Sequence, residues 1–226
     1  MGSADNSLRM GLKIDASTSP PKLSYPSTAM CWYDEKVHHK LGSTIPDHEY
    51  KVRVSIRTVK GRLLLVMTSD NGSISSASID PLGKLYDFNI ATDGPEFERS
   101  NPGTAGQVAT QILQRDQSIG VRKHILNEIS LEIPEYERAP QRPGDTVGHV
   151  RSEDGMDWAN FVYRGVTSYN GMQAALFDIE YIGPHDQPEY GPPLVGFIIV
   201  DAQTAMPILL AFKSGTEKHF EQISCS

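Results

Sequence analysis

The fold of this chain is decided by residues 50–67, which read YKVRVSIRTVKGRLLLVM. Every second residue from Tyr50 to Ile56 is apolar, and this period of two is typical of a strand that buries one face. Lys60-Gly61 predicts a tight turn, and the apolar run that ends at Met67 predicts a second, more buried strand running back. The stretch therefore predicts an antiparallel hairpin.

Strand patterns continue on both sides of this hairpin. Met30–Tyr33 is apolar enough to be a first strand, and two Asn-Gly pairs, at 71–72 and 170–171, predict hairpin turns because both residues tolerate positive φ. Aspartates at 80 and 201 begin two further tight turns, where a carboxylate bonds backbone amides two residues on, so we expect turn roles for them and no catalysis. The other predicted strands cover residues 74–79, 84–90, 158–166, 172–182, 194–201 and 207–212.

The centre of the chain has a different pattern. Thr104 and Gln107 have the spacing of a capping box, and Val108 and Ile112 follow at helical spacing, so residues 103–129 are predicted to be mainly helical. Residues 129–133 also alternate like a strand.

The order of strands, one or two helices, then strands predicts an α+β fold, because alternating strand–helix units are missing from the pattern. We expect a curved antiparallel β-sheet, an unclosed half-barrel, wrapped around one or two central helices. The predicted organisation is a single domain over residues 1–226, with an extended arm at 1–29, a first β-meander at 30–100, the helical segment at 103–129 and a second β-meander at 145–215.

The composition excludes several classes of protein. The chain has 226 residues, of which 38% are apolar and 22% are charged, as in a soluble globular protein. Its 21 basic and 28 acidic residues give a net charge of −7, which disfavours a partner with a phosphate backbone, so no nucleic acid is expected. No apolar run approaches the ~20 residues that span a bilayer, so no transmembrane segment is expected.

The two cysteines do not decide whether the protein resides in an oxidising or a reducing compartment. Cys31 and Cys225 would close a very long loop if an oxidising compartment joined them, and two unconnected thiols are the alternative. The start of the chain lacks the pattern of a signal peptide. Either the chain is cytoplasmic, or Ala4-Asp5 marks a mature start after a removed leader, in which case the protein is periplasmic or otherwise exported.

Residues of the second half resemble a known family. Gly144–Val147, Tyr163–Gly165, Asn170-Gly171 and the ending 199–208 together look like the second half of the LolA-like half-barrel superfamily, the lipoprotein-carrier-like proteins of the bacterial envelope. In that family the closing strands often read strand, Asp, x, x, Thr, Gly, x, Pro, strand, and here Ala205 stands in the place of the glycine. The resemblance implies an open sheet over helices, often with a hydrophobic cavity, outside the cytoplasm.

Candidate site residues fall into two groups. His185, Asp186 and Glu189 place an imidazole and two carboxylates on one Pro-rich loop, which makes them weak candidates for acid/base catalysis. Six aromatic residues are weak candidates for lining a ligand cavity, although aromatic residues more often belong to a plain core: Trp32, Trp158, Tyr163, Phe177, Tyr181 and Phe197. The histidine and cysteine spacings match no metal motif, and no cofactor is expected.

Three functions compete at this point. The leading hypothesis is an extracytoplasmic binding or interaction protein for an apolar small molecule, a lipid or a lipoprotein. An enzyme without cofactor and a structural component of the envelope are the alternatives. The sequence carries no signal for an oligomeric state.

Overall fold

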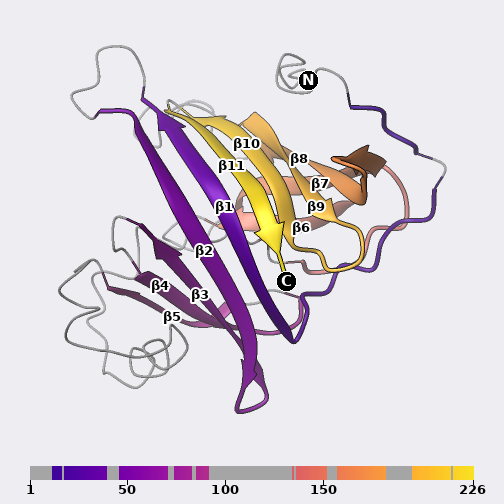
Figure 1. The fold of residues 1–226 in the computed structure, drawn as a ribbon. Helices are drawn as coiled ribbons and strands as arrows, with labels where there is room; N and C mark the ends of the chain where they lie inside the picture. The colour runs from indigo at the N-terminus through magenta and orange to yellow at the C-terminus, as the bar shows by residue number, and fades with distance from the viewer. Residues whose placement is uncertain are drawn as a thin grey trace.

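The computed structural model describes residues 12–16, 18–39, 46–70, 74–82, 85–91, 134, 136–151, 157–181, 195–214 and 216–226. Neighbouring strands pair antiparallel in one 11-stranded sheet of order β5-β4-β3-β2-β1-β11-β10-β9-β8-β7-β6, which curves strongly and leaves β5 and β6 as its two edges (Figure 1). The strands are β1 (Thr28–His38), β2 (His48–Val59), β3 (Arg62–Ser69), β4 (Ile74–Ile79), β5 (Leu85–Ala91), β6 (Thr146–Arg151), β7 (Asp157–Tyr169), β8 (Met172–Tyr181), β9 (Val195–Asp201), β10 (Pro207–Ser214) and β11 (Thr216–Cys225).

The predicted α+β class is wrong. Within the described ranges every regular element is a strand, and no helix occurs there. The helical segment expected at 103–129 lies outside the described residues. Among the described residues, the side chains that cover the inner side of the sheet come in part from irregular segments, around Leu23, Tyr25 and Tyr136.

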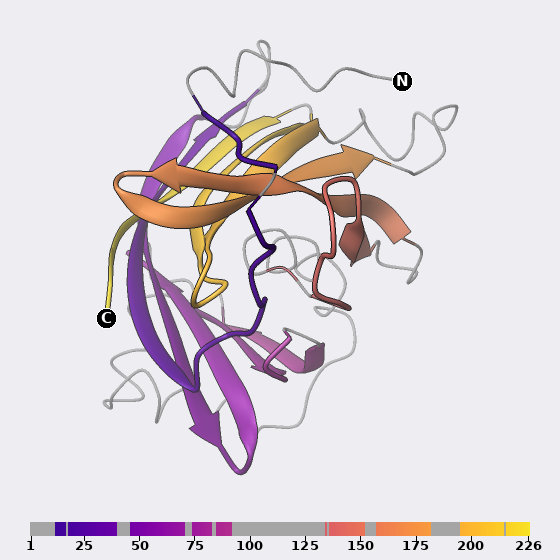
Figure 2. The ribbon, with the colours of Figure 1, turned by 90° about the vertical axis from the view of Figure 1, so that its right-hand side faces the viewer.

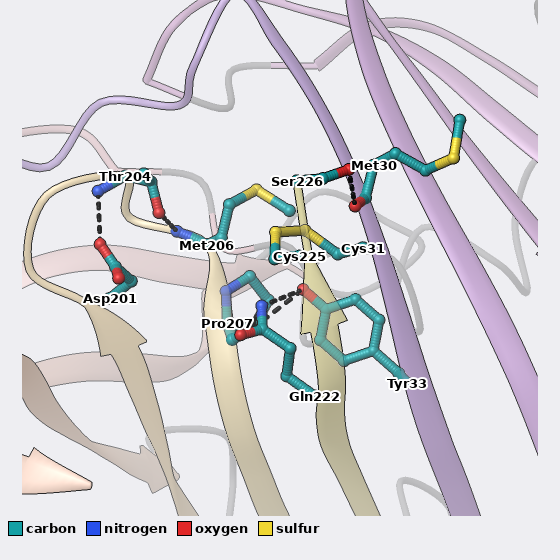
Figure 3. The surroundings of a disulfide bond; sticks show 10 residues. All are labelled: Met30, Cys31, Tyr33, Asp201, Thr204, Met206, Pro207, Gln222, Cys225 and Ser226. Carbon is teal, nitrogen blue, oxygen red and sulfur yellow. Dashed lines mark hydrogen bonds between the residues drawn. A yellow bond between two sulfur atoms is a disulfide. The ribbon is translucent and has the colours of Figure 1, made fainter. Parts of the chain in front are cut away.

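The strand order divides the sheet into two meanders that meet at one seam. Strands β1 to β5 and strands β6 to β11 each follow chain order, and the two sets join where β1 pairs with β11. The Cys31–Cys225 disulfide crosses this seam between directly paired residues that are 194 positions apart in sequence (Figure 3). Beyond it, the backbones of Met30 and Ser226 exchange hydrogen bonds of 2.8 and 2.9 Å.

The two faces of the sheet bury different sets of side chains. We call inner the face that carries Val52, Val54 and Ile56 of β2, because alternation places all three on one side with Cys31 and Tyr33 of β1. This face and the segments over it form the larger cluster, with contributions from both meanders. The opposite, outer face buries a smaller cluster on β8, β9 and β10: Ala174, Leu176, Phe197, Ile199, Ile208, Leu209 and Ala211.

The turn chemistry expected from the sequence is confirmed at four places. Lys60 and Gly61 have φ of 52° and 79°, and Asn170 and Gly171 have φ of 49° and 80°, as a type I′ turn requires. The carboxylate of Asp80 accepts a hydrogen bond from the amide of Leu82 (2.8 Å), and that of Asp201 accepts bonds from the amides of residues 203 and 204. The Asn71-Gly72 turn lies outside the described residues.

An irregular segment of residues 12–16 and 18–27, here called the strap, passes from one face of the sheet to the other (Figure 2). Leu12 packs on the outer cluster, Asp15 forms a β-bridge with Val166 of β7, and Leu23 and Tyr25 pack in the inner cluster. The strap therefore turns around the part of β7 that extends beyond β6 and then crosses the inner side of the curved sheet to reach β1 (Figure 2).

Candidate functional site

Four aromatic rings line up across the inner face. Tyr25 of the strap lies 5.6 Å from Tyr136, Tyr136 lies 6.3 Å from Phe177 of β8, and Phe177 lies 5.5 Å from Tyr163 of β7, measured between ring centroids. We call these four residues the aromatic row. All are buried, and their spacing is that of aromatic pairs that contact each other.

Backbone hydrogen bonds hold the two members of the aromatic row that lie outside the sheet. The amide of Tyr25 donates to the carbonyl of Pro81 (2.7 Å), and the amide of Tyr136 donates to the carbonyl of Leu82 (2.6 Å). Both carbonyls belong to the turn that Asp80 begins, so this turn holds the strap and the segment before β6 together. The amide of Glu137 then bonds Val147 of β6, which attaches the same segment to the second meander.

Of the four buried tyrosines on the inner side, three donate a hydrogen bond to a backbone carbonyl. Tyr25 donates to Pro134 (2.7 Å), Tyr33 donates to Pro207 (3.0 Å; Figure 3), and Tyr136 donates to Ala205 (3.2 Å). The hydroxyl of Tyr163 is buried and has no hydrogen-bond partner among the described residues. Burial raises the pKa of Tyr25 and of Tyr136, so both rings stay neutral.

A buried ion pair marks another part of the inner face. Glu35 of β1 and Lys218 of β11 are 3.2 Å apart, and their side chains are 13% and 10% exposed. Strand alternation places Glu35 between Tyr33 and Val37 on the inner side. The inner face is therefore apolar over most of its described extent and carries one pair of opposite charges at the seam.

The six aromatic candidates from the sequence separate into groups. Tyr163 and Phe177 are adjacent in the aromatic row, and Tyr181 packs against the inner cluster. Trp32 lies on the outer face, 40% exposed, with the guanidinium of Arg53 5.6 Å from its ring centroid. Phe197 is buried in the outer cluster, and the side chain of Trp158 is outside the described part.

The acid/base candidates His185, Asp186 and Glu189 lie outside the described residues, so their placement relative to the inner face stays a prediction. The structure brings Cys31 and Cys225 together in a disulfide. Among the residues that the structure describes, no three His, Cys, Asp or Glu side chains are grouped as a metal site requires. In the same part of the chain, no helix is long and apolar enough to cross a membrane.

Sequence reasoning missed Tyr25 and Tyr136, which make half of the aromatic row. Tyr25 belongs to the segment expected to be an extended arm, and Tyr136 belongs to a Pro-rich loop. Neither has a periodic apolar neighbourhood, which is the signal that marks core positions in strands. Their positions depend on contacts with residues far away in sequence, as the Tyr136–Ala205 hydrogen bond illustrates.

Comparisons with known proteins return matches among solved structures. No protein-family model and no curated sequence matches the chain. A candidate outer membrane lipoprotein-sorting protein domain from Vibrio parahaemolyticus is 9% identical, with 88% of this chain and 85% of that chain covered and a TM-score of 0.35. A DUF1329 family protein from Desulfovibrio piger is 10% identical, with 93% and 86% covered and a TM-score of 0.29.

A LolA superfamily protein from Nitrosomonas europaea is 6% identical, with 90% of this chain and 88% of that chain covered and a TM-score of 0.23. One of these solved structures is named as a member of the LolA superfamily, which the closing strands of the sequence resemble.

Proposed function

We propose that this protein is an extracytoplasmic binding protein for an apolar ligand, a lipid or the lipid part of a lipoprotein, and that the ligand lies along the aromatic row. The observation that carries the proposal is the apolar inner face of an open, curved sheet, to which both meanders contribute. Ligand sites are concave and lined mainly by apolar and aromatic side chains with few polar groups.

The strap supports this proposal because it closes the open side without belonging to the sheet. Its backbone is attached to β7 through the Asp15–Val166 bridge and to the first meander through the bond from Tyr25 to Pro81. A segment with so few backbone hydrogen bonds opens at a lower free-energy cost than a strand inside the sheet. An apolar molecule would reach the aromatic row beneath such a segment.

The disulfide supports the extracytoplasmic location. Cys31 is fully buried and is bonded to Cys225. Structural disulfides form and persist in oxidising compartments and are rare where thiols are kept reduced. A periplasmic or exported location follows from this bond as part of the proposal.

The test compares two phenylalanines that differ mainly in the face they occupy. Phe177 of β8 and Phe197 of β9 are 0% and 2% exposed and lie on opposite faces of adjacent strands. Binding of the fluorescent apolar probe N-phenyl-1-naphthylamine is measured for the wild type, Phe177→Leu and Phe197→Leu. We expect the wild type to bind the probe, Phe177→Leu to bind it several-fold more weakly and Phe197→Leu to match the wild type.

Native mass spectrometry of the purified wild type provides a second measurement, in which a co-purified apolar molecule is expected. The proposal fails if the wild type binds no probe and carries no such molecule. It fails as well if both leucine variants lose binding equally, because the loss would then follow stability and not the inner face.

A further inference from the structure

One of the four buried tyrosine hydroxyls on the inner side differs from the other three. Tyr25, Tyr33, Tyr136 and Tyr163 are each at most 4% exposed. Three of them donate to a carbonyl oxygen at 2.7 to 3.2 Å. The fourth, Tyr163, buries its hydroxyl with no hydrogen-bond partner among the described residues. The aromatic row thus ends in an unsatisfied polar atom.

An unsatisfied hydroxyl is costly to keep in a protein interior. Burying it without a partner loses its hydrogen bonds to water and gains none in return. Phenylalanine would fill the same space in the row without this cost. Native proteins leave few such groups, and those that remain call for an explanation in function or in a bound molecule.

The position of this hydroxyl places it close to the strap, near enough for the charge of Asp15 to act on it. Tyr163 precedes Gly165, whose positive φ and missing Cβ allow the strap to lie directly against β7, since a Cβ there would be 2.7 Å from Ile14 and 2.9 Å from the carbonyl oxygen of Asp15. Burial is the larger cause that raises the pKa of Tyr163, and the negative charge of Asp15 is the smaller one. The hydroxyl is therefore a neutral hydrogen-bond donor close to the carboxylate of Asp15.

We infer that the hydroxyl of Tyr163 donates a hydrogen bond to the bound ligand, which is a neutral amphiphile. This inference rests on the proposed function, and it adds the chemical class of the ligand and its orientation. The apolar chain lies along Phe177 and Tyr136, and an uncharged oxygen, such as that of an ester or a hydroxyl group, meets Tyr163 beneath the strap. The charge of Asp15 disfavours a carboxylate or phosphate at the same place.

The experiment measures how decan-1-ol, decanoate and decane displace N-phenyl-1-naphthylamine from the full chain. For the wild type we expect decan-1-ol to bind about 5- to 10-fold more tightly than decane, the worth of one hydrogen bond, and more tightly than decanoate at pH 8. Tyr163→Phe should bind decane as the wild type does and lose the preference for decan-1-ol. Tyr33→Phe is the matched control and should keep that preference, because Tyr33 lies outside the aromatic row and its hydroxyl is already bonded to the carbonyl of Pro207.

Urea unfolding of Tyr163→Phe and Tyr136→Phe separates a ligand contact from a structural one. Tyr163→Phe should be as stable as the wild type or more stable. Tyr136→Phe should be less stable, because it leaves the carbonyl of Ala205 without its hydrogen-bond donor. The inference is overturned if Tyr163→Phe keeps the preference for decan-1-ol or if it is destabilised as Tyr136→Phe is. A wild type that binds no apolar probe refutes the proposed function and this inference with it, whereas probe binding without a preference for decan-1-ol refutes this inference alone.

Discussion

At the scale of single residues, Asp178 is the polar group of the described sheet whose burial would cost the most free energy without a charged partner. It is 3% exposed in the middle of β8, and Arg164 of β7 donates to its carboxylate at 2.6 Å while also bonding Glu180. A buried carboxylate is tolerated because the guanidinium compensates its charge. Removing the arginine would leave that charge with weaker compensation.

We therefore expect Arg164→Met to lower the free energy of unfolding by about 3 kcal/mol. Arg142→Met provides the control, because Arg142 also faces an aspartate, Asp145, but with a side chain that is 84% exposed, and exposed pairs contribute roughly 0–1 kcal/mol. Urea denaturation of both variants measures the difference. Equal losses would show that burial of Asp178 does not decide the strength of its pair.

Buried tyrosines make stability sensitive to alkaline pH. Burial raises the pKa of Tyr25 and Tyr136, and burial together with a hydrogen bond to Glu221 raises the pKa of Tyr169 to about 12. Unfolded tyrosines ionise near pH 10. Above that pH the unfolded chain binds fewer protons than the folded one, so stability falls as pH rises.

The expected result is a free energy of unfolding that is insensitive to these groups below pH 9 and declines from about pH 10 to 12. Urea midpoints between pH 8 and 12 measure it. Tyr169→Phe should decline less steeply than the wild type, because one of the shifted groups is gone. An unchanged slope for that variant would contradict the role assigned to Tyr169.

Ala205 shows how far residue patterns predict backbone conformation. Asp201 predicted the turn between β9 and β10, and its hydrogen bonds confirm it. The family pattern has glycine at position 205, and Ala205 indeed has a φ of 58°, a conformation that glycine adopts most easily. Its methyl group is fully buried in the inner cluster, which the turn pattern did not predict.

At the scale of elements, the strap depends on one narrow contact with β7. Asp15 and Val166 exchange backbone hydrogen bonds of 2.7 and 3.0 Å, and the hydroxyl of Thr167 donates to the carbonyl of Lys13. Gly165 lies beside this bridge with a φ of 145°, where a side chain is both strained and blocked by Asp15. The edge of β7 is thus shaped to accept the strap.

Gly165→Ala should weaken the attachment of the strap to β7 and leave the pairing of the strands in the sheet intact. Lys13 and Lys22 are exposed on the strap, so limited trypsin digestion should cleave there faster in the variant than in the wild type. Gly171→Ala is the control, since it shares a positive φ but a Cβ there meets nothing within 4 Å. Cleavage at wild-type rate in Gly165→Ala would exclude this contact as the anchor of the strap.

Strands with alternating apolar residues could be predicted from the sequence, and strands without them could not. The pattern at 50–56 corresponds to β2, whose burial alternates over the same residues. Strand β11 was missed because its residues are mostly polar, with Phe220 as the main apolar inner residue. Its Lys218 is buried through a pair with Glu35, a partner that only the fold supplies.

The aromatic row was predictable only where its residues lie in strands with alternating apolar residues. Tyr163 and Phe177 lie in strands that have apolar patterns, and both were candidates from the sequence. Tyr25 and Tyr136 lie in irregular segments held by bonds to the turn at residues 80–82. Sequence periodicity does not report on such long-range contacts, so the row could be recognised only from the structure.

At the scale of the whole molecule, the β1–β11 seam joins the two meanders, and the disulfide fixes one end of it. The double variant Cys31→Ala/Cys225→Ala should lose about 5 kcal/mol of stability, because the bond closes a loop with a sequence separation of 194 residues. Urea unfolding measures the loss. Wild type reduced with a phosphine should unfold at the same urea concentration as the variant, and a large gap between the two would contradict an effect of the bond alone.

The position of the seam also determines when the molecule can become complete during its synthesis. Strand β1 is among the first parts of the described chain to be made, and its partner β11 follows every other described strand. Until β11 emerges, β1 and β10 each have an edge with unpaired backbone groups, which invites pairing with other chains. Long-range pairing of this kind folds slowly. The nascent protein therefore has the greatest need of a chaperone in the interval before its last described strand inserts between β1 and β10.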